Sequence, residues 1–386
     1  MSSRGNWFEQ NPKKTIIFSL IIALILLTYA AEKILAHINR SQNLVLFTDR
    51  RYINLREYPP YLNIQIRPTA RELRESDSLA NKEYLVRTDG YGFILPGAPH
   101  VRPDVSLVFL GWSTTACMYV AEDYRFPVLA GRLLEKETGK KINSYNAGVG
   151  GNNSLHSLDI LLNKIIPLRP DIVVMHHNIN DLFTLLYDKT YWNTNPNKAP
   201  IIDFQIYRNL KGGRAVLSLA RDTFIPNLHL AFKAATKKLF APVKDPDDEF
   251  AHVRGKEVSF SRAELISEFA LNLQTFINIC QARKIVPVLM TQPNRFKDNP
   301  EDLIRKALKD LETDARITYK EYKGLFDEFN ETIREIANKN NILVIDLARL
   351  TPPENRYIYD TVHLNDAGCQ LAAQIISAHL QKVLNK

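Results

Sequence analysis

Short apolar runs alternate with longer helix-like segments across residues 105–386, and this alternation restricts the fold more than any other feature of the chain. The strand-like runs are Val105 to Leu110, Ile142 to Tyr145, Asp171 to Met175, Ile285 to Met290 and Ile342 to Ile345. The helix-like segments are Phe126 to Glu137, Ser154 to Ile166, Arg262 to Arg283, Lys320 to Lys339 and Ala367 to Leu384. Such alternation builds a parallel sheet with right-handed crossovers and helices on both faces. The sequence therefore predicts a three-layer α/β/α sandwich with a mainly five-stranded parallel sheet.

Three side chains in this region have the chemistry of a catalytic triad. Ser113 follows the first strand through a glycine turn, and Asp360 and His363 precede the last helix. Open α/β sheets carry their chemistry at the carboxyl ends of the strands. A serine hydroxyl becomes a good nucleophile when an imidazole takes its proton and a carboxylate orients that imidazole. We therefore expect Ser113, Asp360 and His363 to meet at this edge of the sheet.

Two further polar segments extend the pattern. Residues 146–151 (NAGVGG) follow the second strand, and residues 177–181 (HNIND) follow the third. With the segments around Ser113 and His363, they resemble in order the blocks of the SGNH hydrolase superfamily, also called GDSL-like esterases. The resemblance implies an SGNH or flavodoxin-like sheet, with Ser113 as nucleophile, Gly151 and Asn180 as oxyanion donors, and Asp360 and His363 as the rest of the triad. A donor fixed where negative charge develops is worth roughly 10²- to 10³-fold in rate.

The chain departs from the family pattern at two positions. Trp112 stands where the first block usually has Asp, although Gly111 to Thr115 is closer to the Gly-Gly-Ser-Thr-Thr form of membrane-associated relatives. Asn178 replaces the usual glycine of the third block. We interpret Trp112, Asn178 and the adjacent His177 as pocket-lining residues, with simple packing as the alternative.

Neither a cofactor nor a metal is expected. His176 and His177 are adjacent, but no third ligand accompanies them at a metal-binding spacing. The net charge is +8, yet the basic residues are dispersed among acidic ones and no nucleic-acid module is visible. We expect no nucleic-acid partner, and attraction to an anionic lipid or envelope polymer accounts for the charge equally well.

An uncharged, apolar run from Thr15 to Ala31 begins behind a basic leader. Its length is near the lower limit of the roughly 17 to 25 residues that cross a bilayer. Arg4, Lys13 and Lys14 favour a cytoplasmic amino end, which places the rest of the chain outside the membrane. We predict a cytoplasmic leader at 1–14 and an uncleaved signal anchor at 15–36; a cleaved signal peptide is the alternative.

Two further segments lie outside the four family blocks, one before the first block and one after the third. Residues 37–104 are rich in Arg and Pro and are interpreted as a juxtamembrane stalk that leads into the catalytic domain, residues 105–386. The interval 182–260 is too long for one connection in a compact α/β unit. Because it starts just after Asn180, we interpret it as a cap over the active site; a peripheral insertion or a dimer surface is the alternative.

These features predict a membrane-anchored serine esterase that removes O-acyl, commonly O-acetyl, groups from an envelope glycan or lipid. Two alternatives stay open. One is an O-acyltransferase at the same site, which needs a membrane partner to deliver the acyl group. The other is an inactive envelope-binding protein that keeps the fold. The triad alone does not separate them.

Overall fold

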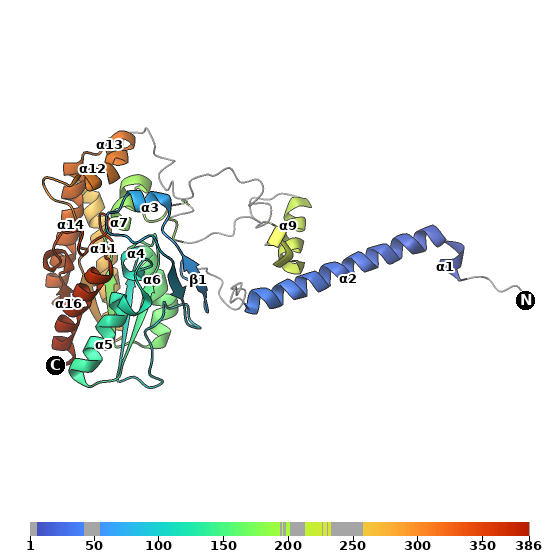
Figure 1. Ribbon diagram of the computed structural model, residues 1–386, viewed down its shortest axis with the longest axis horizontal. Coiled ribbons are helices and arrows are strands. Elements are labelled where there is room, and N and C mark those ends of the chain that lie inside the picture. Colours follow the sequence, from blue (N-terminus) through green and yellow to red (C-terminus); the bar gives the residue numbers. More distant parts are fainter. Residues whose placement is uncertain are drawn as a thin grey trace, which may run out of the picture. The chain divides into compact units, whose positions relative to one another are not determined.

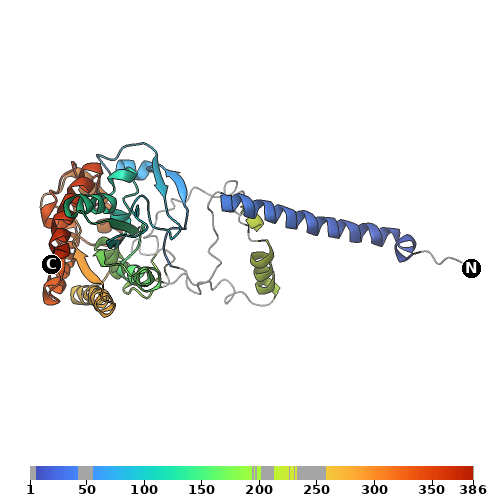
Figure 2. The ribbon, with the colours of Figure 1, turned by 90° about the horizontal axis from the view of Figure 1, so that it is seen from below.

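The computed structural model describes the backbone of residues 6–41, 55–193, 195, 198–200, 213–225, 227–229, 231–232 and 258–385. Contacts divide the chain into two compact units (Figures 1 and 2). The first joins residues 1–46 with 203–247, and the second joins residues 47–202 with 248–386. Each unit is described by itself.

The first unit is built on a long apolar helix, α2 (Pro12–Ser41), which follows the short helix α1 (Trp7–Gln10). Residues 12–37 of α2 have a mean hydropathy of 2.2 over their most apolar window, and this is the one described helix long and apolar enough to cross a membrane. Near its end, the carboxylate of Glu32 accepts hydrogen bonds from the backbone amides of Asn227 and Leu228, at 3.0 and 2.7 Å. These bonds connect α2 to the helical residues 227–229. The same unit includes α9 (Gly213–Phe224).

The second unit contains the predicted parallel sheet. Its strands are β3 (Val105–Gly111), β4 (Ile142–Gly148), β5 (Ile172–His176), β6 (Val286–Met290) and β7 (Leu343–Ile345). They lie in the order β4-β3-β5-β6-β7, and every neighbouring pair is parallel. This is the flavodoxin-like order, in which the chain reverses direction across the sheet between its first and third strands. Because β3 and β5 are these two strands, the segments after them meet at the position where such folds bind ligands.

Helices cover both faces of the sheet, as the alternation of elements predicts. One core cluster joins Leu107 and Phe109 of β3 to α5 (Phe126–Thr138) and α16 (Asp366–Leu384). The other joins Val108 and Leu110 of the same strand to helices on the opposite face. Those helices are α6 (Ser154–Ile160), α11 (Arg262–Ala282) and α14 (Tyr319–Lys339). Successive residues of a strand point to opposite faces, so β3 contributes to both cores.

The ends of these helices follow local sequence signals. Gly139 ends α5 with φ 69°, a left-handed conformation that costs glycine little. Thr318 caps α14, and its hydroxyl and the Glu321 carboxylate exchange hydrogen bonds with each other's backbone amides. Asn365 caps α16, which fixes the entry of the last helix directly after His363.

The segment before the sheet packs on the second unit. Strands β1 (Asn63–Ile66) and β2 (Tyr84–Arg87) form an antiparallel pair, followed by buried Phe93 and Ile94. The backbone amide of Ile94 donates to the carbonyl of Asn146 on β4, at 2.9 Å. The residues around 84–94 are therefore part of the folded body of this unit.

Two intervals between strands of the sheet contain additional helices. Residues 294–318, after β6, include two short helices, α12 (Asp302–Ala307) and α13 (Lys309–Asp314). They form because Ile304, Leu308 and Leu311 are buried on one side of them. The interval 182–260 includes α9, while residues 201–212 and 233–257 are among those outside the described part of the chain.

Candidate active site

Ser113 lies where β3 turns sharply into α4 (Ser113–Ala116). A side chain at Gly111 would meet the Thr115 hydroxyl at 2.2 Å and the His176 carbonyl at 2.9 Å, so this turn requires glycine. The hydroxyl of Thr115 contacts Nδ1 of His176 on β5 at 3.0 Å. The turn that presents Ser113 is therefore fixed against the neighbouring strand.

The three predicted catalytic side chains form one hydrogen-bonded chain. Oγ of Ser113 lies 2.7 Å from Nε2 of His363, although the two residues are 250 positions apart. Nδ1 of His363 lies 2.6 Å from Oδ2 of Asp360. With Nδ1 donating to the carboxylate, Nε2 carries the lone pair that faces the serine hydroxyl. This tautomer suits proton transfer from Ser113.

The Asp360 carboxylate is held by the backbone of its own loop. Its Oδ1 accepts from the amides of Val362 and His363, at 2.8 and 2.7 Å. Burial acts to raise the pKa of Asp360, but the charge of His363 and these hydrogen bonds outweigh it and hold the pKa below its ordinary value. Burial acts to lower the pKa of His363, but the Asp360 charge outweighs it and raises the pKa above the ordinary 6.5.

Two aromatic rings enclose the imidazole of His363. The Tyr359 ring stacks on it with an interplanar angle of 8° and a centroid separation of 5.5 Å. The Trp112 ring lies 5.1 Å away at 54°. Trp112, which we expected beside the pocket, is 4% exposed and packs beside the His363 imidazole. The large side chain next to Ser113 therefore restricts the orientation of that ring.

The loop that carries Asp360 is braced from two other segments. The amide of Arg295 donates to the Thr361 carbonyl at 2.9 Å, and the amide of Asp77 donates to the Tyr359 carbonyl at 3.0 Å. The Arg295 guanidinium is buried and makes two hydrogen bonds of 2.8 Å to the Asp77 carboxylate. Sequence reasoning missed this pair, because nothing in the local pattern around either residue marks it.

The segment after β4 contacts the serine turn through Asn146. Its side-chain amide donates to the Thr115 carbonyl, and its Oδ1 accepts from the Gly148 amide, both at 3.0 Å. The amide of Val149 also donates to the Gly111 carbonyl at 3.1 Å. Gly151 follows with φ 78°, a conformation that favours glycine. The second block is thus fixed beside the first.

Asn180 lies after β5, in the first turn of α7 (Ile179–Phe183), and is 7% exposed. Its Nδ2 donates to the carbonyl of Asn152 at 3.0 Å, which connects the third block to the second. Its Oδ1 lies 3.4 Å from Nζ of Lys198. The two residues that we expected to supply the oxyanion hole, Gly151 and Asn180, therefore lie at adjoining segments.

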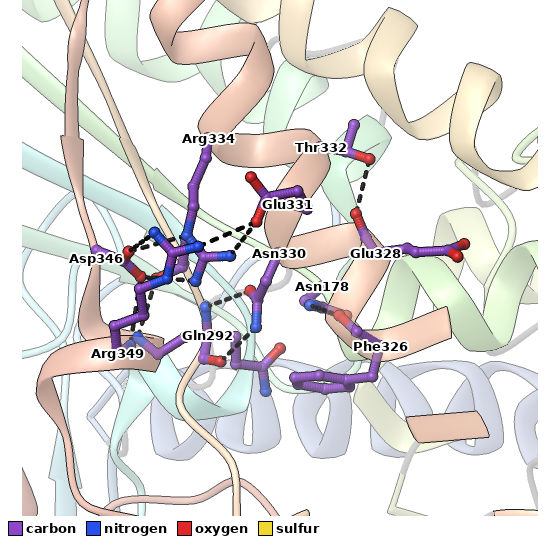
Figure 3. Close-up of polar contacts among 12 residues, drawn as sticks. Asn178, Gln292, Phe326, Glu328, Asn330, Glu331, Thr332, Arg334, Asp346 and Arg349 are labelled. Carbon is purple, nitrogen blue, oxygen red and sulfur yellow. Dashed lines mark hydrogen bonds and ion pairs between the residues drawn. The ribbon is translucent and has the colours of Figure 1, made fainter. Parts of the chain in front are cut away.

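His177 and Asn178 are interior residues, which corrects the expectation that they line a pocket. Asn178 is 0% exposed, and its amide donates to the Phe326 carbonyl of α14 at 3.0 Å (Figure 3). His177 is 1% exposed and contacts the Ser157 hydroxyl at 2.7 Å. The asparagine that stands in place of the usual glycine thus adds a hydrogen bond to a neighbouring helix.

His177 also belongs to a second Ser, His and Asp arrangement. Its Nε2 faces Ser157, and its Nδ1 lies 3.4 Å from the Asp181 carboxylate. All three side chains are buried, and burial lowers the pKa of His177 well below its ordinary value. A nucleophile must reach its substrate, so this arrangement is structural. The partly exposed pair of Asp360 and His363 is the one that a substrate can approach.

A cavity of about 230 Å³ lies beside the catalytic loop. It is lined by Ser78, Leu79, Ala80, Lys82, Tyr84, Tyr119, Tyr359, Asn365, Asp366 and Ala367. Tyr359, which lines this cavity, also stacks on the His363 imidazole. Among the described residues, no group of three His, Cys, Asp or Glu side chains is arranged to hold a metal ion.

A flavodoxin-like sheet that presents a serine, histidine and aspartate chain at its carboxyl edge defines a class of protein, the ester hydrolases of the SGNH type. The chain belongs to the GDSL-like lipase/acylhydrolase family, whose model matches residues 109–371, well over half of its length. The match includes the four segments that carry Ser113, Gly151, Asn180 and His363. The chain is therefore a carboxylic ester hydrolase by family.

Solved structures with a similar fold include three hydrolases of low sequence identity. An α/β hydrolase from the metagenome of Lake Arreo is 14% identical, with a TM-score of 0.41 over 74% of this chain and 98% of that one. The acetylxylan esterase Axe2 from Geobacillus stearothermophilus is 14% identical, with a TM-score of 0.41 over 72% and 95%. A lipase/acylhydrolase from Enterococcus faecalis is 15% identical, with a TM-score of 0.39 over 72% and 96%. A comparison with curated protein sequences finds no match.

Proposed function

We propose that this chain is a membrane-anchored serine esterase that removes O-acyl groups, chiefly O-acetyl, from an envelope glycan or lipid through an acyl-enzyme on Ser113. The observation that carries the proposal is the hydrogen-bonded chain from Ser113 through His363 to Asp360. Its tautomer, partial exposure and raised imidazole pKa are those that general-base activation of a serine requires.

Acylation begins when Oγ of Ser113 attacks the ester carbonyl carbon. The hydroxyl proton passes to Nε2 of His363, and Asp360 stabilises the imidazolium that forms. The carbonyl oxygen takes up the negative charge of the tetrahedral intermediate. The intermediate then collapses: the bond to the alcohol oxygen breaks, and His363 returns its proton to that oxygen. The alcohol leaves, and the acyl group stays on Ser113.

The backbone amide of Gly151 and Nδ2 of Asn180 are the proposed donors to the tetrahedral oxygen. Both are neutral and leave the charge balance of His363 unchanged. In deacylation, His363 takes a proton from water as the water attacks the acyl carbon, and returns that proton to Ser113 as the acid leaves. Each turnover consumes the ester and one water molecule, and Ser113 and His363 are regenerated.

Membrane anchoring is supported by the surface of α2. Leu20, Leu24 and Leu27 are more than 60% exposed, which an aqueous environment disfavours and a lipid environment accommodates. In the same unit, α9 exposes Val216, Leu217 and Phe224 by 67, 71 and 74%. The basic residues before α2 favour a cytoplasmic amino end, with the esterase outside that membrane.

A glycan substrate is supported by the cavity beside the catalytic loop. Three tyrosines, Tyr84, Tyr119 and Tyr359, line it together with polar groups from Asn365 and Asp366. Aromatic faces pack on the apolar side of a sugar ring, and amides and carboxylates bond its hydroxyl groups. Its volume of about 230 Å³ accommodates one sugar unit.

The test uses the full-length chain in detergent. We expect a fluorophosphonate probe to label the folded protein and p-nitrophenyl acetate to be hydrolysed, and both signals to disappear in Ser113→Ala. Ser157→Ala is the matched control. Because Ser157 lies in the buried arrangement with His177, this variant should still be labelled by the probe. A folded wild-type protein that is neither labelled nor active would support an inactive binding protein instead.

Esterase and transferase activities are separated with an acetylated oligosaccharide and an added unacetylated acceptor. We expect free acetate to account for most of the acetyl groups lost. Transfer to the acceptor in excess of acetate release would overturn hydrolysis in favour of an acyltransferase.

A further inference from the structure

Lys198 is a nearly fully buried lysine next to the proposed oxyanion hole. Its side chain is 2% exposed and comes from the interval that follows α7. Nζ lies 3.5 Å from the carbonyl oxygen of Gly151 and 3.4 Å from Oδ1 of Asn180. One cation thus contacts the carbonyl groups of both residues that are proposed to stabilise the oxyanion.

Lys198 and the Asn152 carbonyl together favour one orientation of the Asn180 amide. An ammonium group only donates hydrogen bonds, so it selects the oxygen of the amide and turns Nδ2 away from itself. Nδ2 carries two hydrogens, and one of them is donated to the Asn152 carbonyl at 3.0 Å. The other is left to point at a developing oxyanion. Without the cation, the amide keeps only the Asn152 contact to distinguish its two ends.

The segment that carries Lys198 is itself held by a buried histidine. Nε2 of His156 lies 2.9 Å from the carbonyl oxygen of Ala199, the next residue, and therefore carries the donated hydrogen. Nδ1 of the same ring accepts from the Asn153 amide at 3.0 Å. Burial and the charge of Arg56 lower the pKa of His156 to about 3. The ring is thus neutral at physiological pH, and it fixes Lys198 without adding a second positive charge.

We propose that Lys198 is a positioning residue of the oxyanion hole, which orients the Asn180 amide and polarises it toward the transition state. The inference rests on the proposed function, and it gives the interval 182–260 a direct part in the site. Polarisation of a hydrogen-bond donor strengthens its bond to a negative oxygen more than its bond to a neutral carbonyl. The effect should therefore appear in kcat, with KM little changed.

The experiment measures kcat and KM for p-nitrophenyl acetate with the full-length chain, together with its circular dichroism melting curve. Lys198→Met should lower kcat at least tenfold, and Lys198→Arg should restore most of the activity because it keeps the charge. Lys164→Met is the matched control. Lys164 is also a buried lysine, paired with Glu57 at 2.8 Å, so its loss should affect the melting temperature and leave kcat unchanged.

A double-mutant cycle with Asn180→Ala separates positioning from a general structural role. If Lys198 acts through the Asn180 amide, Lys198→Met should cost less than threefold once that amide is gone. An equal cost in both backgrounds, or wild-type kcat in folded Lys198→Met, overturns the inference. Should Lys198→Met fail to fold, Lys198→Gln, which keeps a donor without the charge, is used in the cycle and judged by the same criteria.

The outcomes distinguish this inference from the proposed function. If the wild-type enzyme is active and the effects of Lys198→Met and Asn180→Ala are additive, only the proposed role of Lys198 is overturned. A folded wild-type enzyme without esterase activity overturns the proposed function, and the inference with it.

Discussion

The imidazole of His363 is held by contacts at both of its ring nitrogens and by two aromatic rings packed beside it. Asp360 fixes one ring nitrogen, Ser113 faces the other, and the rings of Trp112 and Tyr359 pack beside the imidazole. A base that is already oriented loses little entropy when the reaction begins. The residue-level predictions follow from this restraint and from the charges around it.

The first prediction concerns pH. His363 must be neutral to accept the serine proton, and the Asp360 charge raises the pKa of His363 above 6.5. We therefore expect kcat/KM for p-nitrophenyl acetate to fall as the pH drops through a value above 6.5. Asp360→Asn removes the negative charge, so the acid limb should shift to lower pH and the plateau should fall by about 10⁴-fold. An acid limb that keeps its position in this variant would show that another group sets the pKa.

The second prediction concerns Asn180. Asn180→Ala removes one donor to the oxyanion, and we expect a loss of roughly 10²- to 10³-fold in kcat. The melting curve should establish that the variant is folded. Asn163→Ala, at an exposed asparagine, is the control and should retain full activity. Wild-type kcat in Asn180→Ala would remove Asn180 from the oxyanion hole.

At the level of single residues, sequence reasoning succeeds where local order carries the signal. The joint order of the segments, read with their strand context, predicted that Ser113, Asp360 and His363 would meet, and the three are hydrogen-bonded in the structure. The contact between Thr115 and His176 could not be predicted from the sequence, because it depends on which strands are neighbours in the sheet. Lys198 could not be predicted either, since no periodic pattern surrounds that residue. The catalytic roles themselves remain predictions.

At the scale of elements, α14 is attached to the carboxyl end of β6 through one buried amide. Oδ1 of Asn330 accepts from the Gln292 amide at 2.9 Å, and its Nδ2 donates to the Gln292 carbonyl at 3.0 Å (Figure 3). Oε1 of Gln292 in turn accepts from the amide of Ile179, next to Asn180. Farther along α14, Arg334 makes two hydrogen bonds of 2.9 Å to Asp346. These contacts connect α14 to the segments that follow β5, β6 and β7.

The third prediction is about this attachment. Asn330→Ala leaves the buried backbone groups of Gln292 without their partners, and we expect the free energy of unfolding to fall by roughly 2 to 4 kcal/mol. Chemical denaturation measures the change. Glu335→Ala, at an exposed position of the same helix, should stay within about 0.5 kcal/mol of the wild type. Similar stabilities for the two variants would contradict the role of the Asn330 amide.

The elements of the sheet unit were predictable within a few residues because their apolar periodicity is regular. The predicted strand at Val105 to Leu110 extends one residue farther, to Gly111. The helix expected from Ser154 to Ile166 is α-helical only to Ile160. It then continues as a π-helical turn (Leu161–Ile165) and a 3₁₀ turn (Ile166–Leu168). The short helices α12 and α13 were missed, because six residues show too little periodicity to distinguish a helix from a loop.

At the scale of the whole molecule, the fourth prediction is that the long helix α2 anchors the chain in a membrane. We expect the full-length chain to stay with membranes after alkaline extraction and to keep its amino-terminal residues by mass spectrometry. Changing Leu20 and Leu24 together to Arg should release the chain, since each Arg in the centre of a span costs about 3 kcal/mol. Leu271→Arg, at an exposed leucine of α11, is the control and should stay bound. A shortened chain would indicate a cleaved signal peptide.

The separation of 250 residues between Ser113 and His363 has a consequence for the way this enzyme comes into being. In the proposed mechanism the nucleophile is synthesised long before its base, so a chain that ends before His363 lacks the group that would activate Ser113. The proposed catalytic chain can therefore form only after the segment that carries Asp360 and His363 has been synthesised. We therefore expect an incomplete chain that ends before His363 to lack esterase activity.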